Sequence, residues 1–342
     1  MEVVIIGGGI VGLSTAHYVA DRGADVTLYE QGSLGTGSTA RAAGGIRSQF
    51  STPVNVELSL ASKRVWDAFE AEFGVDIGLR KTGYLFLARS EATAERFREN
   101  VRTQRDRGAE SEYLAPAEAV EHCPGLDPEP FVGASYNPDD GVADPNLAVQ
   151  GYAAAAREGG VDVRVAALAG VDLPISPRRR RVAVVAPSRS VPPSVPLTID
   201  LETGSYFRPE GDRLALVGGH FGDPDPEQDP DDYDDDMDLA WATTAVERAA
   251  AYTTYFGPET RIRRGWAGLY AVTPDHHPVI EESVPGLVTA AGFSGHGFQH
   301  APATGQVVAD IVHDDEPQLV DVSMLDADRF ERGEGLDERN VA

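Results

Sequence analysis

Apolar positions predict strands and helices that take turns along almost the whole chain. Strand-length apolar runs occupy 2–6, 25–29, 83–88, 161–165, 181–185, 214–217 and 287–291. Apolar residues at helical spacing occupy 13–22, 55–73, 91–107, 147–157, 239–255 and 301–312. The stretch 124–145 is rich in turn residues. This alternation is typical of an α/β protein.

The N-terminus carries the most specific pattern. The first apolar run leads directly into Gly-x-Gly-x-x-Gly, formed by Gly7, Gly9 and Gly12, and Glu30 follows the second predicted strand. Glycines at this spacing permit a tight turn, close approach of a pyrophosphate and close packing of helix on strand, while the acid accepts hydrogen bonds from a ribose. The helix N-terminus would face the phosphates. We therefore predict a dinucleotide-binding βαβ unit.

Two further glycine-rich segments flank predicted elements. The segment 35–47 combines glycines with Ser38 and Thr39, which would let backbone lie against a phosphate or a flat ring system. A flexible surface loop explains it equally well. The turn 292–298 lies between a strand and a helix, so a second helix N-terminus could face an anion or an electron-rich ring edge.

Composition limits the class of protein. With 342 residues, we expect one large domain or two interleaved ones, and a hydrophobic content of 42% suffices for a core. No apolar run is long enough to span a bilayer. Cys123 is the one cysteine, so neither a disulfide framework nor a cysteine metal cluster is expected. Because the fingerprint starts at residue 2, we expect no targeting peptide and a cytoplasmic location.

The charge is strongly negative, with 55 acidic against 29 basic residues and a formal net charge of −26. Such a field repels nucleic acid. An acidic, lysine-poor surface suggests a halophilic protein, in which salt screens the self-repulsion. The segment 223–238 concentrates acids and prolines, and we expect a solvated loop there. Its spacing does not match an EF-hand calcium loop.

Together these motifs resemble a known family. The glycine triplet with Glu30, the segments 35–47 and 292–298, and the run 266–275 look like the D-amino-acid oxidase/sarcosine oxidase-type superfamily of FAD-dependent oxidoreductases. The branch with sarcosine oxidase β, dimethylglycine dehydrogenase and proline dehydrogenase β proteins is most similar. The resemblance implies a Rossmann-type FAD-binding domain formed by 1–80, 140–172 and 262–342. An inserted mixed α/β substrate domain would comprise 81–139 and 173–261.

The resemblance also implies non-covalent FAD and a set of residues around it. Covalent sarcosine oxidases attach the flavin through a cysteine where this chain has Gly268. No metal site is implied. The residues expected to hold FAD are Gly7, Gly9, Gly12, Glu30, Ser38, Thr39, Gly44, Gly45, Gly295, His296 and Gly297.

Four residues are candidates for the substrate side. Arg47 could clamp a carboxylate bidentately, although an ordinary surface arginine is an open alternative. Tyr270 stands where glycine and D-amino-acid oxidases carry a carboxylate-binding arginine, which favours the sarcosine/proline-like branch. His296 could contact flavin or substrate, or could simply pack in the fold. Gln299 replaces a substrate-binding lysine of sarcosine oxidases and can still donate a hydrogen bond.

The chain departs from the family in two further ways. Its only lysines, Lys63 and Lys81, lie far in sequence from the strand where sarcosine oxidases carry an oxygen-activating lysine, which favours a dehydrogenase with another, unknown electron acceptor. Near 165–166 the strand 161–165 runs straight into a helix-like segment, so by comparison with the family we expect a deletion there of roughly forty residues of the usual Rossmann-type sheet. Stability and flavin retention would both suffer.

These expectations lead to one main hypothesis. The chain would oxidise the C–N bond of a small amine or amino acid, such as sarcosine, dimethylglycine or proline, by hydride transfer to FAD. A 2-hydroxy-acid dehydrogenase on the same scaffold is one alternative. A catalytically impaired flavoprotein, as one subunit of a hetero-oligomer, is another. An NAD-dependent enzyme would leave the segments 35–47 and 292–298 unexplained.

Overall fold

The computed structural model describes all residues except 165–172, 222–226, 231, 315, 336–337 and 341–342. The strands are β1 (Glu2–Ile6), β2 (Asp25–Tyr29), β3 (Gly45–Ile46), β4 (Tyr84–Ala88), β5 (Glu112–Leu114), β6 (Gly133–Asn137), β7 (Gly141–Val142), β8 (Asp162–Arg164), β9 (Ser176–Ala186), β10 (Leu197–Asp200), β11 (Ser205–Glu210), β12 (Leu214–Gly219), β13 (Arg261–Val272), β14 (Val279–Val284) and β15 (Leu287–Ala291). The helices are α1 (Ile10–Asp21), α2 (Ser38–Arg41), α3 (Pro53–Phe73), α4 (Glu91–Asp106), α5 (Pro116–His122), α6 (Pro145–Glu158), α7 (Leu239–Ala250), α8 (Gly297–Asp314) and α9 (Arg329–Arg332), with a 3₁₀ turn at Ser323–Leu325.

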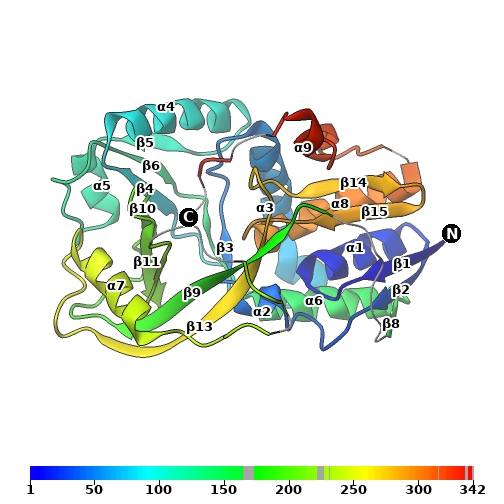
Figure 1. Ribbon diagram of the computed structural model, residues 1–342, viewed down its shortest axis with the longest axis horizontal. Helices are drawn as coiled ribbons and strands as arrows, with labels where there is room; N and C mark the ends of the chain where they lie inside the picture. The colour runs from blue at the N-terminus through cyan, green and yellow to red at the C-terminus, as the bar shows by residue number, and fades with distance from the viewer. Residues whose placement is uncertain (165–172, 222–226, 231, 315, 336–337, 341–342) are drawn as a thin grey trace.

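One half of the molecule is the predicted βαβ unit. Strands β1, β2 and β8 form a parallel sheet in that order, with Ile5 of β1 in register with Leu28 of β2. Helices α1, α6 and α8 pack together beside it, and α8 brings the C-terminal part of the chain back against the N-terminal fingerprint (Figure 1). Their apolar faces share one core that includes Leu13, Leu28 and Tyr152, all fully buried.

The other half is built on a mixed sheet of eight strands in the order β13-β9-β12-β11-β10-β4-β6-β5 (Figure 1). All neighbours are antiparallel except β10 and β4. One apolar cluster joins this sheet to α7, and a second, around Phe86 and Phe97, joins it to α4. The long strands β9 and β13 run from this sheet towards the βαβ half. The α/β class with a Rossmann-type unit is thus confirmed.

Helix α8 begins four residues before the predicted start at 301, although it contains Pro302. Two side chains of α3 satisfy the backbone groups beside the proline. Ser62 accepts a hydrogen bond from the N–H of Ala303 at 3.1 Å, and the Trp66 indole donates to the carbonyl of Gln299 at 3.0 Å. Sequence periodicity could not reveal this help from a distant helix.

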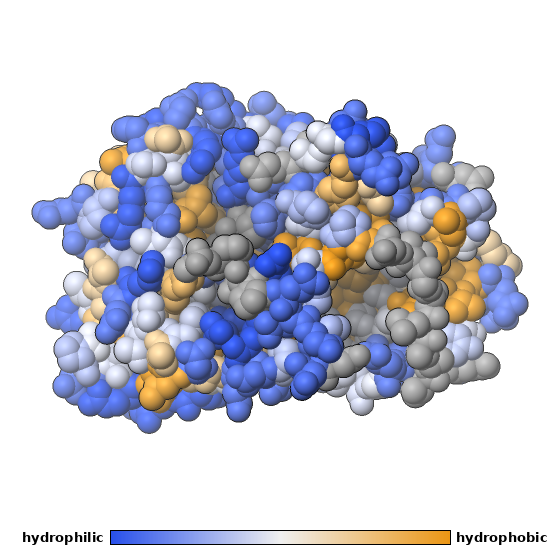
Figure 2. All heavy atoms as spheres, viewed as in Figure 1, coloured by the Kyte–Doolittle hydropathy of each residue, from blue (hydrophilic) through white to orange (hydrophobic). Residues whose placement is uncertain are grey.

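Strand β1 lies at the edge of its sheet among the described residues. Val4 and Ile6 are 56% and 53% exposed on it, against 2% for Val26 on β2. An uncovered apolar strand at this place is what a missing neighbouring segment would leave. The predicted deletion site itself, at 165–166, lies outside the described residues. Figure 2 shows further apolar residues gathered in a hollow near α1, α8 and the β14–β15 hairpin.

The acidic segment 223–238 is only partly the solvated loop predicted for it. Asp234 and Asp238 pair with Arg179 and Arg181 of β9 at 3.0 and 3.2 Å, and Asp235 pairs with Arg41 of α2 at 2.8 Å. The arginine-rich strand β9 therefore binds the end of the acidic run. The sequence alone did not predict this pairing, because the acidic and basic residues lie far apart along the chain.

Candidate functional site

A cavity of about 360 Å³ lies between the two halves. Both glycine-rich segments and the large sheet contribute to its wall. The lining residues are Gly9–Val11, Ser38, Thr39, Ala42–Gly45, Arg47, Tyr84, Leu197, Ile199, Tyr206, Leu269–Ala271 and Ala290–Gln299. Segments more than 200 residues apart in the sequence, Ser38–Gly45 and Gly292–Gln299, thus meet at one site.

The turn after β1 has the form that a pyrophosphate needs. A side chain on Gly12 would place its Cβ 1.9 Å from the carbonyl oxygen of Gly7, so only glycine allows α1 to start this close to the strand. Glu30 accepts hydrogen bonds from the N–H groups of Gly8 and Gly32 at 2.7 and 2.8 Å. A carboxylate has further lone pairs for ribose hydroxyls. Gly9 lies in the wall of the cavity, whereas Gly7, Gly12 and Glu30 are not among its lining residues.

The segment 35–47 is held against the cavity by its own hydroxyl groups. Ser38 donates to the carbonyl of Leu269 on β13 at 2.7 Å, and Thr39 accepts from the N–H of Ile10 at 3.2 Å. These bonds join the segment to both halves of the molecule. The alternative of a free surface loop is therefore wrong. Gly44 and Gly45 complete this wall.

The opposite wall is the turn between β15 and α8. Ser294 and Gly295 both have positive φ, 49° and 93°. A Cβ on Gly295 would lie 2.4 Å from the ring of Tyr270, so the glycine is needed for the tyrosine to reach the cavity. Gly295, His296 and Gly297 all line the cavity at the start of α8. This arrangement of two glycine walls fits the FAD assignment.

Arg47 is the buried cation of this cavity, with only 6% of its surface exposed. Its guanidinium donates to the backbone carbonyls of Gln49 and Asn340 and stacks over the ring of Phe50, 4.0 Å from the centroid. No carboxylate among the described residues forms an ion pair with it. Burial lowers the pKa of Arg47, although not enough to discharge an arginine. A buried cation without a directly paired carboxylate favours binding of an anionic ligand, although the charges of Glu338 and Asp140 already partly offset the effect of burial on the pKa of Arg47.

Two histidines beside Arg47 are uncharged. Burial, and then the nearby charge of Arg47, holds the pKa of His296 well below its usual value, and the same causes lower the pKa of His300 to about 3. His296 Nε2 lies 3.3 Å from Arg47 Nη2. Because a guanidinium can only donate, Nε2 must accept, and the proton of His296 is on Nδ1.

Gln299 lines the cavity, but its side-chain oxygen is used to bind the backbone of Arg47. Its side-chain oxygen accepts from the N–H of Arg47 at 2.8 Å, while its residue lines the cavity. Fully buried Asp140 accepts a hydrogen bond from the N–H of Ser48, the residue after Arg47, and pairs with Lys63 at 2.9 Å. Neither Lys63 nor Lys81 lines the cavity.

Sequence reasoning missed the wall supplied by the large sheet. Tyr84 on β4 and Tyr206 on β11 join Tyr270 in the lining, with Leu197 and Ile199 of β10 between them. Burial raises the pKa of all three phenols, so they remain neutral hydrogen-bond donors. Strands β10 and β11 were not predicted at all, and the pattern of Gly83-Tyr84 indicated only a strand.

Comparison with known proteins identifies the family. The family described as "FAD dependent oxidoreductase" matches residues 2–167 and 164–311. The chain belongs to this family, and the predicted FAD cofactor is confirmed. The two matched parts meet at 164–167, where the sequence predicts the deletion.

Individual relatives match along almost the full chain. "FAD-dependent oxidoreductase domain-containing protein 1" of Xenopus laevis is 29% identical over 428 residues, which cover 99% of this chain and 84% of the relative. Glycine oxidase of Geobacillus kaustophilus is 28% identical over 91% of this chain and 92% of its own. Among solved structures, L-proline dehydrogenase from P. horikoshii superimposes with a TM-score of 0.85 at 30% identity, covering 97% and 98%. The predicted resemblance to this superfamily is confirmed.

No helix of the described residues is long and apolar enough to cross a membrane. The same residues contain no group of three histidine, cysteine or acidic side chains suited to a metal ion.

Proposed function

We propose that this FAD-dependent oxidoreductase oxidises the C–N bond of a small amino acid whose nitrogen is a secondary or tertiary amine, such as sarcosine, dimethylglycine or proline. The observation that carries the proposal is the buried guanidinium of Arg47, which faces the cavity without a carboxylate partner among the described residues. A substrate carboxylate would supply the missing charge by accepting charge-assisted hydrogen bonds from the N–H groups of Arg47 that Gln49, Asn340 and His296 leave unused. The glycine oxidase and L-proline dehydrogenase matches support an amino-acid substrate.

The residues of the chain then have mainly binding and orienting roles. Arg47 holds the carboxylate, and the apolar side chains Leu197 and Ile199 exclude water from the rest of the ligand. The neutral phenols of Tyr84, Tyr206 and Tyr270 can donate to the ligand without repelling it electrostatically. Bound FAD supplies the hydride acceptor. Because Gly268 offers no nucleophile, FAD is held non-covalently.

The proposed site assignments keep the set expected from the sequence. Gly7, Gly9, Gly12 and Glu30 hold the pyrophosphate and ribose, the segments 35–47 and 292–298 hold the flavin, and His296 and Gln299 position Arg47. We also propose the domain boundaries expected from the sequence, except that β13 (Arg261–Val272) belongs to the large sheet of the other half. The exposed strand β1 supports a subunit of a larger assembly.

The same cavity would bind a 2-hydroxy acid through the same arginine, so substrate class needs a direct test. Protein purified in molar salt, to screen its net charge of −26, is titrated without oxygen. The proposal expects sarcosine or proline to bleach the flavin bands and lactate or 2-hydroxyglutarate to leave them unchanged. Bleaching by the hydroxy acids alone would support the alternative. A colourless protein that cannot be reconstituted with FAD would contradict every catalytic version.

We propose a dehydrogenase because neither lysine lies at the cavity to assist oxygen reduction. Lys63 is engaged by Asp139 and Asp140, at 2.8 and 2.9 Å. Turnover should therefore be faster with an artificial dye than with oxygen. Peroxide formation as fast as dye reduction would show an oxidase instead.

A further inference from the structure

The C-terminal segment returns to the candidate site although it lies beyond the family match, which ends at residue 311. Arg329, only 1% exposed, anchors it by pairing with Asp275 at 2.8 Å and donating to the carbonyl of His277 at 2.9 Å. Burial by itself would raise the pKa of Asp275, but the bonds from Arg329 and from the N–H of His277 outweigh it and lower that pKa. The segment is therefore fixed to the turn after β13.

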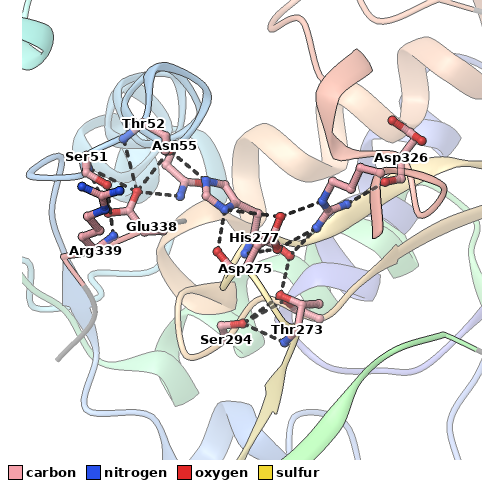
Figure 3. Close-up of polar contacts among 12 residues, drawn as sticks. Ser51, Thr52, Asn55, Thr273, Asp275, His277, Ser294, Asp326, Glu338 and Arg339 are labelled. Atoms are coloured by element: carbon pink, nitrogen blue, oxygen red, sulfur yellow. Dashed lines mark hydrogen bonds and ion pairs between the residues drawn. The ribbon is translucent and has the colours of Figure 1, made fainter. Parts of the chain in front are cut away.

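Glu338 is the second anchor. Its carboxylate is 1% exposed and lies at the N-terminus of α3, where backbone and side-chain donors converge on it (Figure 3). The donors are Ser51 N at 2.9 Å, Ser51 Oγ at 2.7 Å, Thr52 N at 3.3 Å, Thr52 Oγ1 at 3.1 Å, Asn55 Nδ2 at 3.2 Å and Asn340 N at 3.0 Å. A negative charge at this end of a long helix is also stabilised by the helix dipole.

Two residues after Glu338, the chain reaches the guanidinium of the cavity. The backbone carbonyl of Asn340 accepts a hydrogen bond from Arg47 Nη2, and the Asn340 side chain donates to the carbonyl of Gln49 at 3.2 Å. The Gln49 carbonyl is itself the acceptor of Arg47 Nη1. The C-terminal segment thus supplies one of the two backbone oxygens that orient this guanidinium and, through the Asn340 side chain, binds the other.

We propose that Glu338 is a positioning residue for carboxylate binding: by fixing residues 338–340 on the N-terminus of α3, it orients the Arg47 guanidinium towards the cavity. This rests on the proposed function, in which Arg47 binds the substrate carboxylate. The directions of the remaining N–H groups of Arg47 depend on the angle of the guanidinium plane, and two fixed carbonyl acceptors determine that plane. Without Glu338, the six hydrogen-bond donors around it lose their acceptor, and residues 338–340 are no longer fixed to α3. Arg47 then keeps its charge but loses its orientation.

The test measures binding of a small carboxylate, independently of turnover. Propionate and its neutral analogue propionamide are titrated calorimetrically into FAD-loaded wild type, Glu338→Ala, Glu334→Ala and Arg47→Met. Glu334 is the matched control because it belongs to the same segment but makes a surface pair with Arg332. We expect Glu338→Ala to weaken propionate binding by about tenfold. Propionamide binding, FAD content and the Glu334→Ala variant should be unchanged.

The outcomes separate this inference from the proposed function. If Arg47→Met weakens propionate binding but Glu338→Ala does not, the positioning role is wrong and the proposed function stands. If Arg47→Met has no effect, both are wrong. Equal weakening of both probes in Glu338→Ala would show a merely structural role. If that variant does not fold, Asn340→Ala replaces it, with about a threefold selective loss expected and no selective loss overturning the proposal.

Discussion

Arg47 Nη2 lies 3.3 Å from His296 Nε2, and both side chains are buried in the wall of one cavity. Since the arginine keeps its charge and burial keeps the pKa of the histidine low, the pair carries one positive charge at all physiological pH values. The site therefore offers a constant charge for an anionic ligand. Its own groups should add no titration to ligand binding near neutral pH.

The contact between Gly295 and Tyr270 can be tested by one methyl group. In Gly295→Ala the Cβ would lie 2.4 Å from the tyrosine ring at a φ of 93°. Gly286→Ala is the matched control, because its φ is 86° but no atom lies within 4 Å of its Cβ. Both variants should lose roughly 1–2 kcal/mol of stability from the backbone alone. Only Gly295→Ala should lose FAD on gel filtration, and equal FAD retention would contradict the placement of Tyr270.

Stability should fall on acidification because two histidines are buried uncharged. Burial lowers the pKa of His300 to about 3, against 6.5 for a free side chain, and holds that of His296 well below it. Unfolding below pH 6.5 therefore takes up protons, so the stabilisation is complete above pH 6.5 and is lost as pH falls towards the folded-state values. Each histidine contributes a slope of up to about 1.4 kcal/mol per pH unit.

Urea unfolding of wild type and His300→Gln between pH 7 and 5, at constant salt, measures these slopes. The variant should be less stable at pH 7, because it changes the buried contact of His300 with Ser59 at 2.9 Å. Its free energy of unfolding should nevertheless fall less steeply with decreasing pH than that of wild type, by the slope that one histidine contributes. Parallel curves would show that His300 is not buried uncharged.

The exposure of β1 predicts unequal effects of the same substitution on neighbouring strands. Val4→Ala should change the free energy of unfolding by less than about 0.5 kcal/mol, because Val4 is 56% exposed. Val26→Ala should cost about 2 kcal/mol, because Val26 is 2% exposed in the core. Similar losses in urea unfolding would show that another part of the chain or a partner covers β1.

Local patterns were sufficient to predict the N-terminal half of the site. The turn at Gly7–Gly12 and the acid Glu30 both depend on residues close in sequence. Strands β10, β11 and β13 were missed because their burial comes from packing in the large sheet rather than from alternation. The same limit applies to Tyr84 and Tyr206, which become cavity residues only when the sheet is assembled.

The C-terminal contacts were hidden for the same reason. Glu338 contacts Ser51 across 287 residues of sequence separation and Asn340 contacts Arg47 across 293, and nothing in their neighbours marks them as functional. His277, in the turn after β13, is fully buried and contacts Thr52 at 2.9 Å. Polar residues of this kind show their role only through three-dimensional partners.

The most direct test of the account is anaerobic flavin reduction by proline and by pyrrolidine, which lacks only the carboxylate. Wild type should be bleached by proline at least about a hundredfold more efficiently, because the charged pair with Arg47 in a buried site is lost with pyrrolidine. In Arg47→Met this preference should nearly disappear while FAD remains bound. Equal reduction of wild type by both amines, or an unchanged preference in Arg47→Met, would contradict the central role of Arg47.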